Sequence, residues 1–482
     1  MAFSKFLTKR KKDAIELLNL LSSDFDYVSI LGSDIKAKNI MKNRMMESIS
    51  EGSDTACGFT IKLNKGGSVF EYSLDDINKD KKKLKEKIIN DLKLDDNLKK
   101  LELNINLNDN EKLEQNFVRK NDLNKFSDEE LLSISSKIVE DTLALDNHFV
   151  NVNVNIAIQD VSKLFVSKTK ILTQNYSWVN GMIMGVYKSD NSKTIMEREG
   201  TYSYLLKDVI KDLPKLIKPL QNKCMHLIDA KPIKAGLYDV ITDPSISGLI
   251  AHEAFGHGVE MDQFVKDRAK GKYYVGKYVA SKVVNMKDGA ACILPGTKDN
   301  ISVASYFFDD DGILAKDTQI IKDGILVSGI SDFTSSSILN TTPTGNGRRE
   351  SYKRKAYSRM TNTYFEAGND KLEDMIKSIK HGYMLFETNN GMEDPKNWGI
   401  QCVCNYGIEI IDGKLTENYV SPVVMSGYVP DLLKSITMVS DSAKVIGSGS
   451  CGKGYKEWVR VSDGGPHLKA KVKLAWEMYM NY

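Results

Sequence analysis

Cysteine, histidine and long apolar runs are all scarce in this sequence. Its 482 residues include only six cysteines, which are widely scattered. This usage is typical of a reduced, intracellular protein rather than a small domain built on disulfides. No run of about 18 apolar residues occurs, and no apolar run follows the basic N-terminal segment, so neither a membrane span nor a secretory signal is expected. Together these absences predict a cytoplasmic protein without a membrane partner.

The sequence also lacks an excess of charge of either sign. It has 67 basic and 64 acidic side chains, for a net charge of +3. This balance gives no reason to expect a nucleic acid as partner. Hydrophobic residues make up 41% and charged residues 27%, which are ordinary values for globular proteins with sizeable cores. The length indicates two to three domains.

The first part of the chain mixes helical and strand patterns. The turn sequence at residues 64–67 contains two glycines between apolar runs and predicts a β-hairpin. Residues 76–100 alternate charges with Leu and Ile at helical spacing, which predicts a helix with a solvated charged face. Ser127, followed three residues later by Glu130, matches a capping box at a helix start. We interpret residues 1–230 as a mixed α/β N-terminal domain.

The second part of the chain has turn sequences at the spacing typical of a β-rich domain. Hairpin-type turns at 310–312, 322–324 and 411–414 separate apolar runs. One helix is expected to interrupt them, at about residues 248–262. We therefore predict an α+β fold of two domains, with residues 231–482 forming a C-terminal domain rich in antiparallel sheet.

That helix carries the main chemical motif of the sequence. His252 and His257 lie five residues apart, and Glu253 directly follows the first. Neutral imidazoles ligate zinc, and a neighbouring carboxylate can accept a proton from the attacking water. Five residues advance a regular helix by about 500°, which leaves the two rings about 140° apart. We therefore predict a π-type turn across the pair, eased by the backbone freedom of Gly256.

A catalytic zinc site usually has three protein ligands and one open position. The residue pattern leaves four candidates for the third ligand: Glu260, Asp262, His467 and Cys451. Glu260 can equally be a residue that does not bind the metal but hydrogen-bonds to a ligand histidine. Cys451 lies among glycines, where a flexible loop with an incidental thiol is the competing interpretation. A histidine pair that packs without metal is the alternative for the motif itself.

Four segments, taken in order, resemble the TldD subunit of the TldD/TldE (PmbA) family of zinc metallopeptidases. The order and spacing agree from about residue 230 to the end, whereas the N-terminal half resembles the family only in general pattern. The segments are HEAFGHGVE at 252–260, PTGNGRRESY at 343–352, RMTNTY at 359–364 and GSCGK at 449–453.

The resemblance implies one Zn²⁺ per active subunit, held by His252, His257 and Cys451, with Glu253 as general base. It also implies hydrolysis of unfolded or precursor peptides without ATP. Family members work as dimers, so the expected partner is a TldE/PmbA-like subunit or a second copy of this chain. Because the histidine motif is intact, the chain resembles the active subunit.

Some roles stay open at the level of sequence. Glu260, Arg348, Arg349, Tyr352 and His467 are candidates for substrate contacts or for support of the ligands, and the last four are candidate donors to the oxyanion. A zinc-containing dimer subunit that binds peptides without cutting them is the alternative function. A hydrolase acting on small amides is a third possibility.

Overall fold

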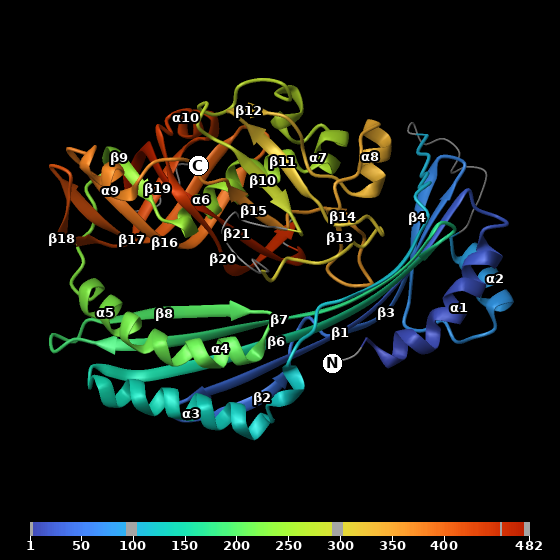
Figure 1. Cartoon of the computed structure of the whole chain (residues 1–482), viewed down its shortest axis with the longest axis horizontal. Helices are drawn as coiled ribbons and strands as arrows, with labels where there is room; N and C mark the ends of the chain where they lie inside the picture. The colour runs from blue at the N-terminus through green and yellow to red at the C-terminus, as the bar shows by residue number, and fades with distance from the viewer. Residues whose placement is uncertain (1–2, 93–103, 292–301, 454–455, 477–482) are drawn as a thin grey trace.

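The computed structural model describes residues 3–92, 104–291, 302–453 and 456–476. These residues form two large sheets, one of eight strands and one of eleven, whose strands come from separate parts of the chain. In Figure 1 the first sheet is a long curved layer, and the second sheet with its helices lies against one face of it. The predicted α+β fold class is confirmed.

The N-terminal sheet has the order β4-β3-β1-β6-β7-β5, with β2 paired to β1 and β8 paired to β7. All of these pairs are antiparallel except β5–β7. Its elements are α1 (Lys5–Leu21), β1 (Tyr27–Asn43), β2 (Glu47–Glu51), β3 (Ala56–Lys65), β4 (Ser68–Leu74), α2 (Lys81–Asp91), β5 (Leu113–Val118), α3 (Asp128–Leu145), β6 (Phe149–Ser167), β7 (Lys170–Lys188), β8 (Thr194–Ser203), α4 (Leu206–Asp212) and α5 (Ile217–Leu227).

Local sequence signals in this half have the expected structural outcome. The hairpin β3–β4 turns at Gly66 and Gly67, whose φ angles of 55° and 81° favour glycine. Ser127 and Glu130 form both hydrogen bonds of a capping box at the start of α3. The helix expected over residues 76–100 is α2 (Lys81–Asp91) in its first part, and residues 93–100 lie outside the described ranges. No helix in the described ranges is long and apolar enough to cross a bilayer.

The C-terminal sheet has the order β12-β11-β10-β15-β21-β19-β17-β16-β9, with β18 paired to β17 and β20 paired to β21. Its pairs are antiparallel except β15–β21 and β16–β9. Its strands are β9 (Gly236–Thr242), β10 (Met286–Gly289), β11 (Asp317–Lys322), β12 (Ile325–Leu326), β15 (Asn362–Phe365), β16 (His381–Asp394), β17 (Gly399–Ile411), β18 (Lys414–Val420), β19 (Val423–Tyr428), β20 (Met438–Lys453) and β21 (Lys456–Ala475). The helices are α6 (Pro244–Ile250), α7 (Met261–Val265), α8 (Phe333–Leu339), α9 (Leu372–Lys377) and α10 (Val429–Lys434), and a small hairpin joins β13 (Gly347–Arg348) and β14 (Tyr357–Ser358).

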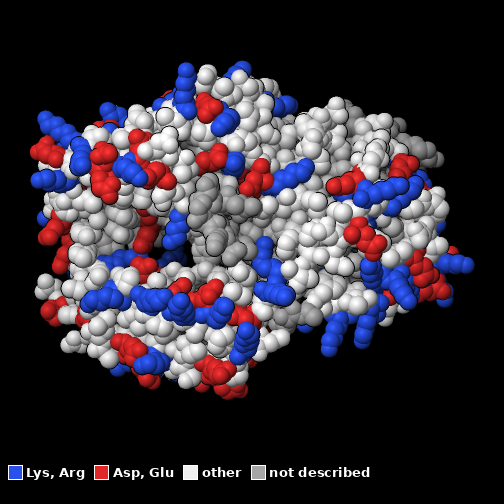
Figure 2. Space-filling view, in the orientation of Figure 1, with Lys and Arg blue, Asp and Glu red and all other residues white. Residues whose placement is uncertain are grey.

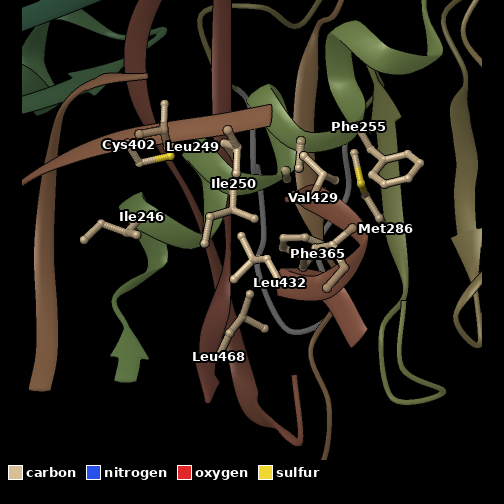
Figure 3. Packing of buried hydrophobic residues seen from close by; sticks show 14 of the residues in the cluster. Ile246, Leu249, Ile250, Phe255, Met286, Phe365, Cys402, Val429, Leu432 and Leu468 are labelled. Atoms are coloured by element: carbon tan, nitrogen blue, oxygen red, sulfur yellow. The ribbon is translucent and has the colours of Figure 1, made fainter. Parts of the chain in front are cut away.

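The helix that carries the histidine motif is held in the core of this half. Ile246 and Ile250 of α6 are buried, and they belong to the same apolar cluster as Leu432 of α10 and Leu468 of β21 (Figure 3). Each fully buried side chain of this kind contributes about 1.5–3 kcal/mol through removal of apolar area from water. The motif is therefore anchored by packing on the side away from its polar residues.

The predicted domain boundary at 230/231 lies between the last strand of the first sheet and the first strand of the second sheet. The last strand of the first sheet ends at Ser203, and α4 and α5 pack on that sheet through buried residues such as Val209 and Leu220. The first strand of the second sheet begins at Gly236. The boundary at 230/231 lies between these elements and stays a proposal.

Candidate metal centre

The predicted distortion of the histidine helix is present. α6 begins at the N-cap Asp243, whose carboxylate accepts a hydrogen bond of 2.8 Å from the backbone N–H of Ile246. A π-helical turn, Ala251–Gly256, follows α6, and the backbone N–H of His257 donates to the carbonyl of His252. This i→i+5 bond widens the helix so that positions five apart share a face. The five-residue spacing therefore requires the π turn, and the prediction is confirmed.

Gly256 serves the site in a different way from the one expected. Its φ of −68° is ordinary helical backbone, so no special conformational freedom is used. A Cβ at this position would collide with the sulfur of Met360. The glycine leaves the space that the buried side chain of Met360 occupies beside the helix.

Three side chains from two distant parts of the chain converge at the π turn. His252, His257 and Cys451 each offer a ligand atom, and these atoms all lie within 4.8 Å of one another. The two imidazole rings are perpendicular, with centroids 5.2 Å apart. The sulfur of Cys451 lies 3.4 Å from Nε2 of His257. Cys451 belongs to strand β20, opposite Val459 of β21, so it lies on a paired strand and not on a flexible glycine loop.

The chemistry of this cluster suits a divalent metal. Two imidazole nitrogens and one sulfur are a donor set that zinc accepts in catalytic sites. Burial raises the pKa of the Cys451 thiol, but the neighbouring His257 and His252 outweigh it and hold that pKa well below its usual value. Nδ1 of His252 is buried without a hydrogen-bond partner among the described residues. Within those residues the cluster contains three ligand side chains, which leaves a position for water or substrate.

Glu260 supports the cluster and does not belong to it. Its carboxylate lies 3.4 Å from Nδ1 of His257 and 3.1 Å from the ammonium of Lys453. Burial raises the pKa of Glu260, but Lys453 and His257 together lower it to about 2. Glu260 is therefore an anion that orients the ring of His257, the arrangement common behind metal-bound histidines.

Arg359 also supports the ligand cluster. It stands in the RMTNTY segment, but no role was predicted for it from sequence alone. Its guanidinium is 1% exposed and donates to the carbonyl of Cys451 at 2.7 Å. It also donates to the carbonyl of Glu457 and lies 3.6 Å from the carboxylate of Glu260. One buried cation therefore fixes the backbone of the cysteine and the partner of His257 at the same time.

Glu253 faces a large cleft between the two halves of the chain. The cleft has a volume of about 1900 Å³ and is lined by β8 on one side and by β16, the π turn and β20 on the other. Figure 2 shows the molecule hollowed between these two parts. Glu253 is partly exposed in this cleft, directly beside the ligand His252. A carboxylate in this position can reach a water or peptide that enters the site.

Two further acids of the cleft were missed by sequence reasoning. Burial raises the pKa of Glu393 on β16 to about 9, and His257 lowers it only in part. Burial likewise raises the pKa of Asp463 on β21 to about 7, against the opposing influence of His252. Neither residue stands in a recognisable motif, because only the folded sheet brings β16 and β21 to the metal ligands.

The remaining predicted residues lie away from this cluster. Arg349 pairs with Glu71 at 3.0 Å, and the hydroxyl of Tyr352 donates to Asp75, so both bind the N-terminal half. Arg348 donates to the carbonyl of Met360 at 2.6 Å. His467 does not line the cleft, and its backbone N–H donates to Ser440. The structure therefore brings none of these four side chains to the cleft.

The half of the chain that contains the histidine pair is similar to known metallopeptidases. Residues 235–474 match the model of the PmbA/TldA metallopeptidase C-terminal domain. A zinc metalloprotease TldD homolog of Saccharolobus solfataricus is 31% identical over 262 residues, which are 54% of this chain and 56% of that protein. A metalloprotease of Methanothermobacter thermautotrophicus is 30% identical over 260 residues, 54% of this chain and 55% of that protein. The matches thus span about half the length of these curated relatives.

Solved structures extend the likeness of fold over nearly the whole chain. TldE from Thermococcus kodakarensis superposes with a TM-score of 0.71 at 18% identity, covering 96% of this chain and 100% of that one. A candidate modulator of a DNA gyrase from Thermotoga maritima gives 0.76 at 17% identity, covering 96% and 100%. The chain is a member of the TldD/PmbA family of metallopeptidases, through the domain that contains the histidine pair.

Proposed function

We propose that this chain is a zinc-dependent peptidase that hydrolyses unfolded or precursor peptides without ATP. The observation that carries the proposal is the convergence of His252, His257 and Cys451 beside Glu253, on the floor of an open cleft. Zn²⁺ held by these three side chains would polarise a peptide carbonyl and make a water more acidic. The relatives named as metalloproteases support the reaction, and the one from Saccharolobus solfataricus named as a zinc metalloprotease supports the choice of metal.

The chain's own residues have distinct tasks in this proposal. Glu253 accepts a proton from the attacking water and returns it to the amine that leaves. Glu260 and Arg359 hold His257 and the backbone of Cys451 in place. These supports are buried and paired, so the site needs little rearrangement when a peptide enters.

The peptide is proposed to bind as an added strand. β9 pairs with β16 only as far as Leu385, and in the described structure no strand pairs with this edge of β16 beyond that point. Residues 388–393 of the free edge line the cleft next to the π turn. Backbone hydrogen bonds to such an edge hold extended peptides with little regard to sequence, which suits unfolded substrates.

The assembly and location are proposals as well. The fold shared with TldE supports a dimer with a TldE/PmbA-like subunit or with a second copy of this chain. We place the protein in the cytoplasm and assign it neither a nucleic-acid nor a membrane partner. A subunit that keeps zinc for structure alone is the weaker alternative, because a structural zinc site is closed by a fourth protein ligand.

The test is substitution of the general base in the zinc-loaded protein. Glu253→Gln should retain zinc, as measured by elemental analysis, and lose about 10²–10⁴-fold in cleavage of a denatured-protein digest followed by mass spectrometry. Glu417→Gln removes the same charge from an exposed position on β18 and serves as the control. Wild-type cleavage by the Glu253→Gln variant would contradict the role of Glu253. Zinc-loaded wild type that cuts no peptide would favour the non-catalytic alternative.

A further inference from the structure

Zn²⁺ at the ligand cluster would polarise the peptide carbonyl, but neither the three ligands nor Glu253 offers a hydrogen-bond donor to its oxygen. When water attacks a peptide carbonyl, negative charge develops on the carbonyl oxygen, and a hydrogen-bond donor aimed at that oxygen lowers the barrier. The four side chains suggested by sequence for this task, Arg348, Arg349, Tyr352 and His467, do not line the cleft. A donor that adds to the polarisation by the metal would therefore come from a residue that the fold, and not the motif, brings to the site.

Glu393 lies on the strand that passes directly over the general base. A Cβ at Gly391 would lie 2.8 Å from Cγ of Glu253 and 2.8 Å from Leu249, so β16 contacts the histidine helix at this point. Glu393 is two residues farther along the same strand, and side chains two apart share a face of a sheet. Both positions line the cleft. The side chain of Glu393 therefore extends along the floor of the cleft beside Glu253.

The surroundings of Glu393 favour its neutral form. Its Oε2 is buried and has no hydrogen-bond partner in the described structure. Nor does any lysine or arginine of the described ranges form an ion pair with it. The charged groups that face it are His257, Glu253, Glu260 and Asp394, of which the three carboxylates disfavour a second negative charge. A half-buried carboxyl whose unpaired oxygen is shielded from water and has no cation beside it favours the protonated form, which keeps an O–H to donate.

We propose that Glu393, as a neutral carboxylic acid, donates a hydrogen bond to the carbonyl oxygen of the scissile peptide and stabilises the oxyanion. No bond to Glu393 forms or breaks, and its proton stays on the carboxyl throughout. Glu393 is not one of the clustered ligand atoms, so this role is separate from metal binding. The inference rests on the proposed peptidase function and adds the residue that binds the reacting oxygen.

The first experiment separates donation from charge by comparing two variants of the zinc-loaded protein. Glu393→Ala removes the donor, so kcat should fall about 10²–10³-fold with zinc content unchanged. Glu393→Gln keeps an N–H₂ donor of similar shape, so its kcat should stay within about tenfold of wild type. Wild-type kcat/KM should decline at alkaline pH as Glu393 loses its proton, and this decline should be absent from the amide variant. A Gln variant as impaired as the Ala variant, or an Ala variant with full activity, would refute the proposal.

The second experiment uses binding alone, so that it does not depend on turnover. A phosphonamidate peptide carries a tetrahedral anionic oxygen in place of the planar carbonyl. Glu393→Ala should bind this analogue about 10²-fold more weakly than wild type by calorimetry, whereas its affinity for the parent peptide, measured in the Glu253→Gln background, should not change. Equal affinities of wild type and Glu393→Ala for the analogue would exclude Glu393 as the donor. Inactive wild type that still shows the affinity difference would instead count against the proposed hydrolysis.

Discussion

The two flanks of the histidine pair each contain a glutamate, and the two glutamates, Glu260 fully buried and Glu393 half-buried, favour opposite protonation states. On the β20 flank, Lys453 and Arg359 surround Glu260, whose pKa is lowered to about 2. On the β16 flank, Glu393 meets no paired cation in the described structure, and burial raises its pKa to about 9. The same side chain is therefore an anion on one side of the site and an acid on the other.

Glu260 and Glu393 are the same residue type, so their different protonation states follow from the presence or absence of a neighbouring cation. A buried anion next to a ligand histidine fixes the ring and increases its basicity. A half-buried neutral acid next to the general base offers a hydrogen bond without adding charge to the site. Three experiments test the division between the two flanks.

The largest effect is expected from the ligand that belongs to the β20 flank. Cys451→Ser replaces a thiolate whose pKa is held low by two histidines with a hydroxyl that stays protonated. Zinc affinity, measured by competition with a chelator, should fall by more than the roughly 10–100-fold typical of losing a supporting residue. Cys57→Ser, at an exposed position, is the control and should leave affinity unchanged. Equal zinc affinity of the two variants would exclude Cys451 as a ligand.

A smaller effect, on stability, is expected when a cation that neutralises Glu260 is removed. Arg359→Leu leaves the buried charge of Glu260 with one cation fewer and frees the carbonyl of Cys451. Breaking a buried ion pair on one side costs about 3–5 kcal/mol, which denaturant unfolding would detect. Arg354→Leu, half-exposed in its pairing with Glu350, should cost less than about 1 kcal/mol. If both variants lose the same free energy of unfolding, the ion pair of Arg359 with Glu260 contributes no more to stability than an exposed pair does.

The smallest effect concerns the stability of the β16 flank as a function of pH. The folded-state pKa of Glu393 is about 9, above its ordinary value of 4.5, so folding favours the protonated form. Its contribution to stability is complete below pH 4.5 and is lost progressively as pH rises toward 9. In chelator-treated protein, Glu393→Gln should therefore raise the melting temperature at about pH 8 by a few degrees and leave it unchanged at about pH 4.5. A shift of the same size at both pH values would contradict a buried neutral acid.

Sequence reasoning succeeded where physical requirements are local. The capping box at Ser127 and the glycine turn after β3 depend on neighbouring residues alone, and both have the expected form. The five-residue spacing of His252 and His257 demanded a π turn for geometric reasons, and that turn is present. Cys451 was different, because the residue pattern left four third-ligand candidates open and only the family resemblance singled it out.

Sequence reasoning did not succeed where the answer depends on what packs against a residue from elsewhere in the chain. Arg349 and Tyr352 stand in a motif shared with the family, yet their partners Glu71 and Asp75 belong to the N-terminal half. Gly256 makes room for the side chain of Met360, which lies far along the chain, and its own φ angle is ordinary for any residue.

The sequence by itself therefore determined the α+β class, the π turn and the chemistry available at the histidine pair, since each follows from residues close together in the chain. Only the tertiary structure decided which acid near that pair is charged. Glu260 and Glu393 have the same side chain, and their pKa values differ because strand β20 and Arg359 bring cations to one and β16 brings none to the other.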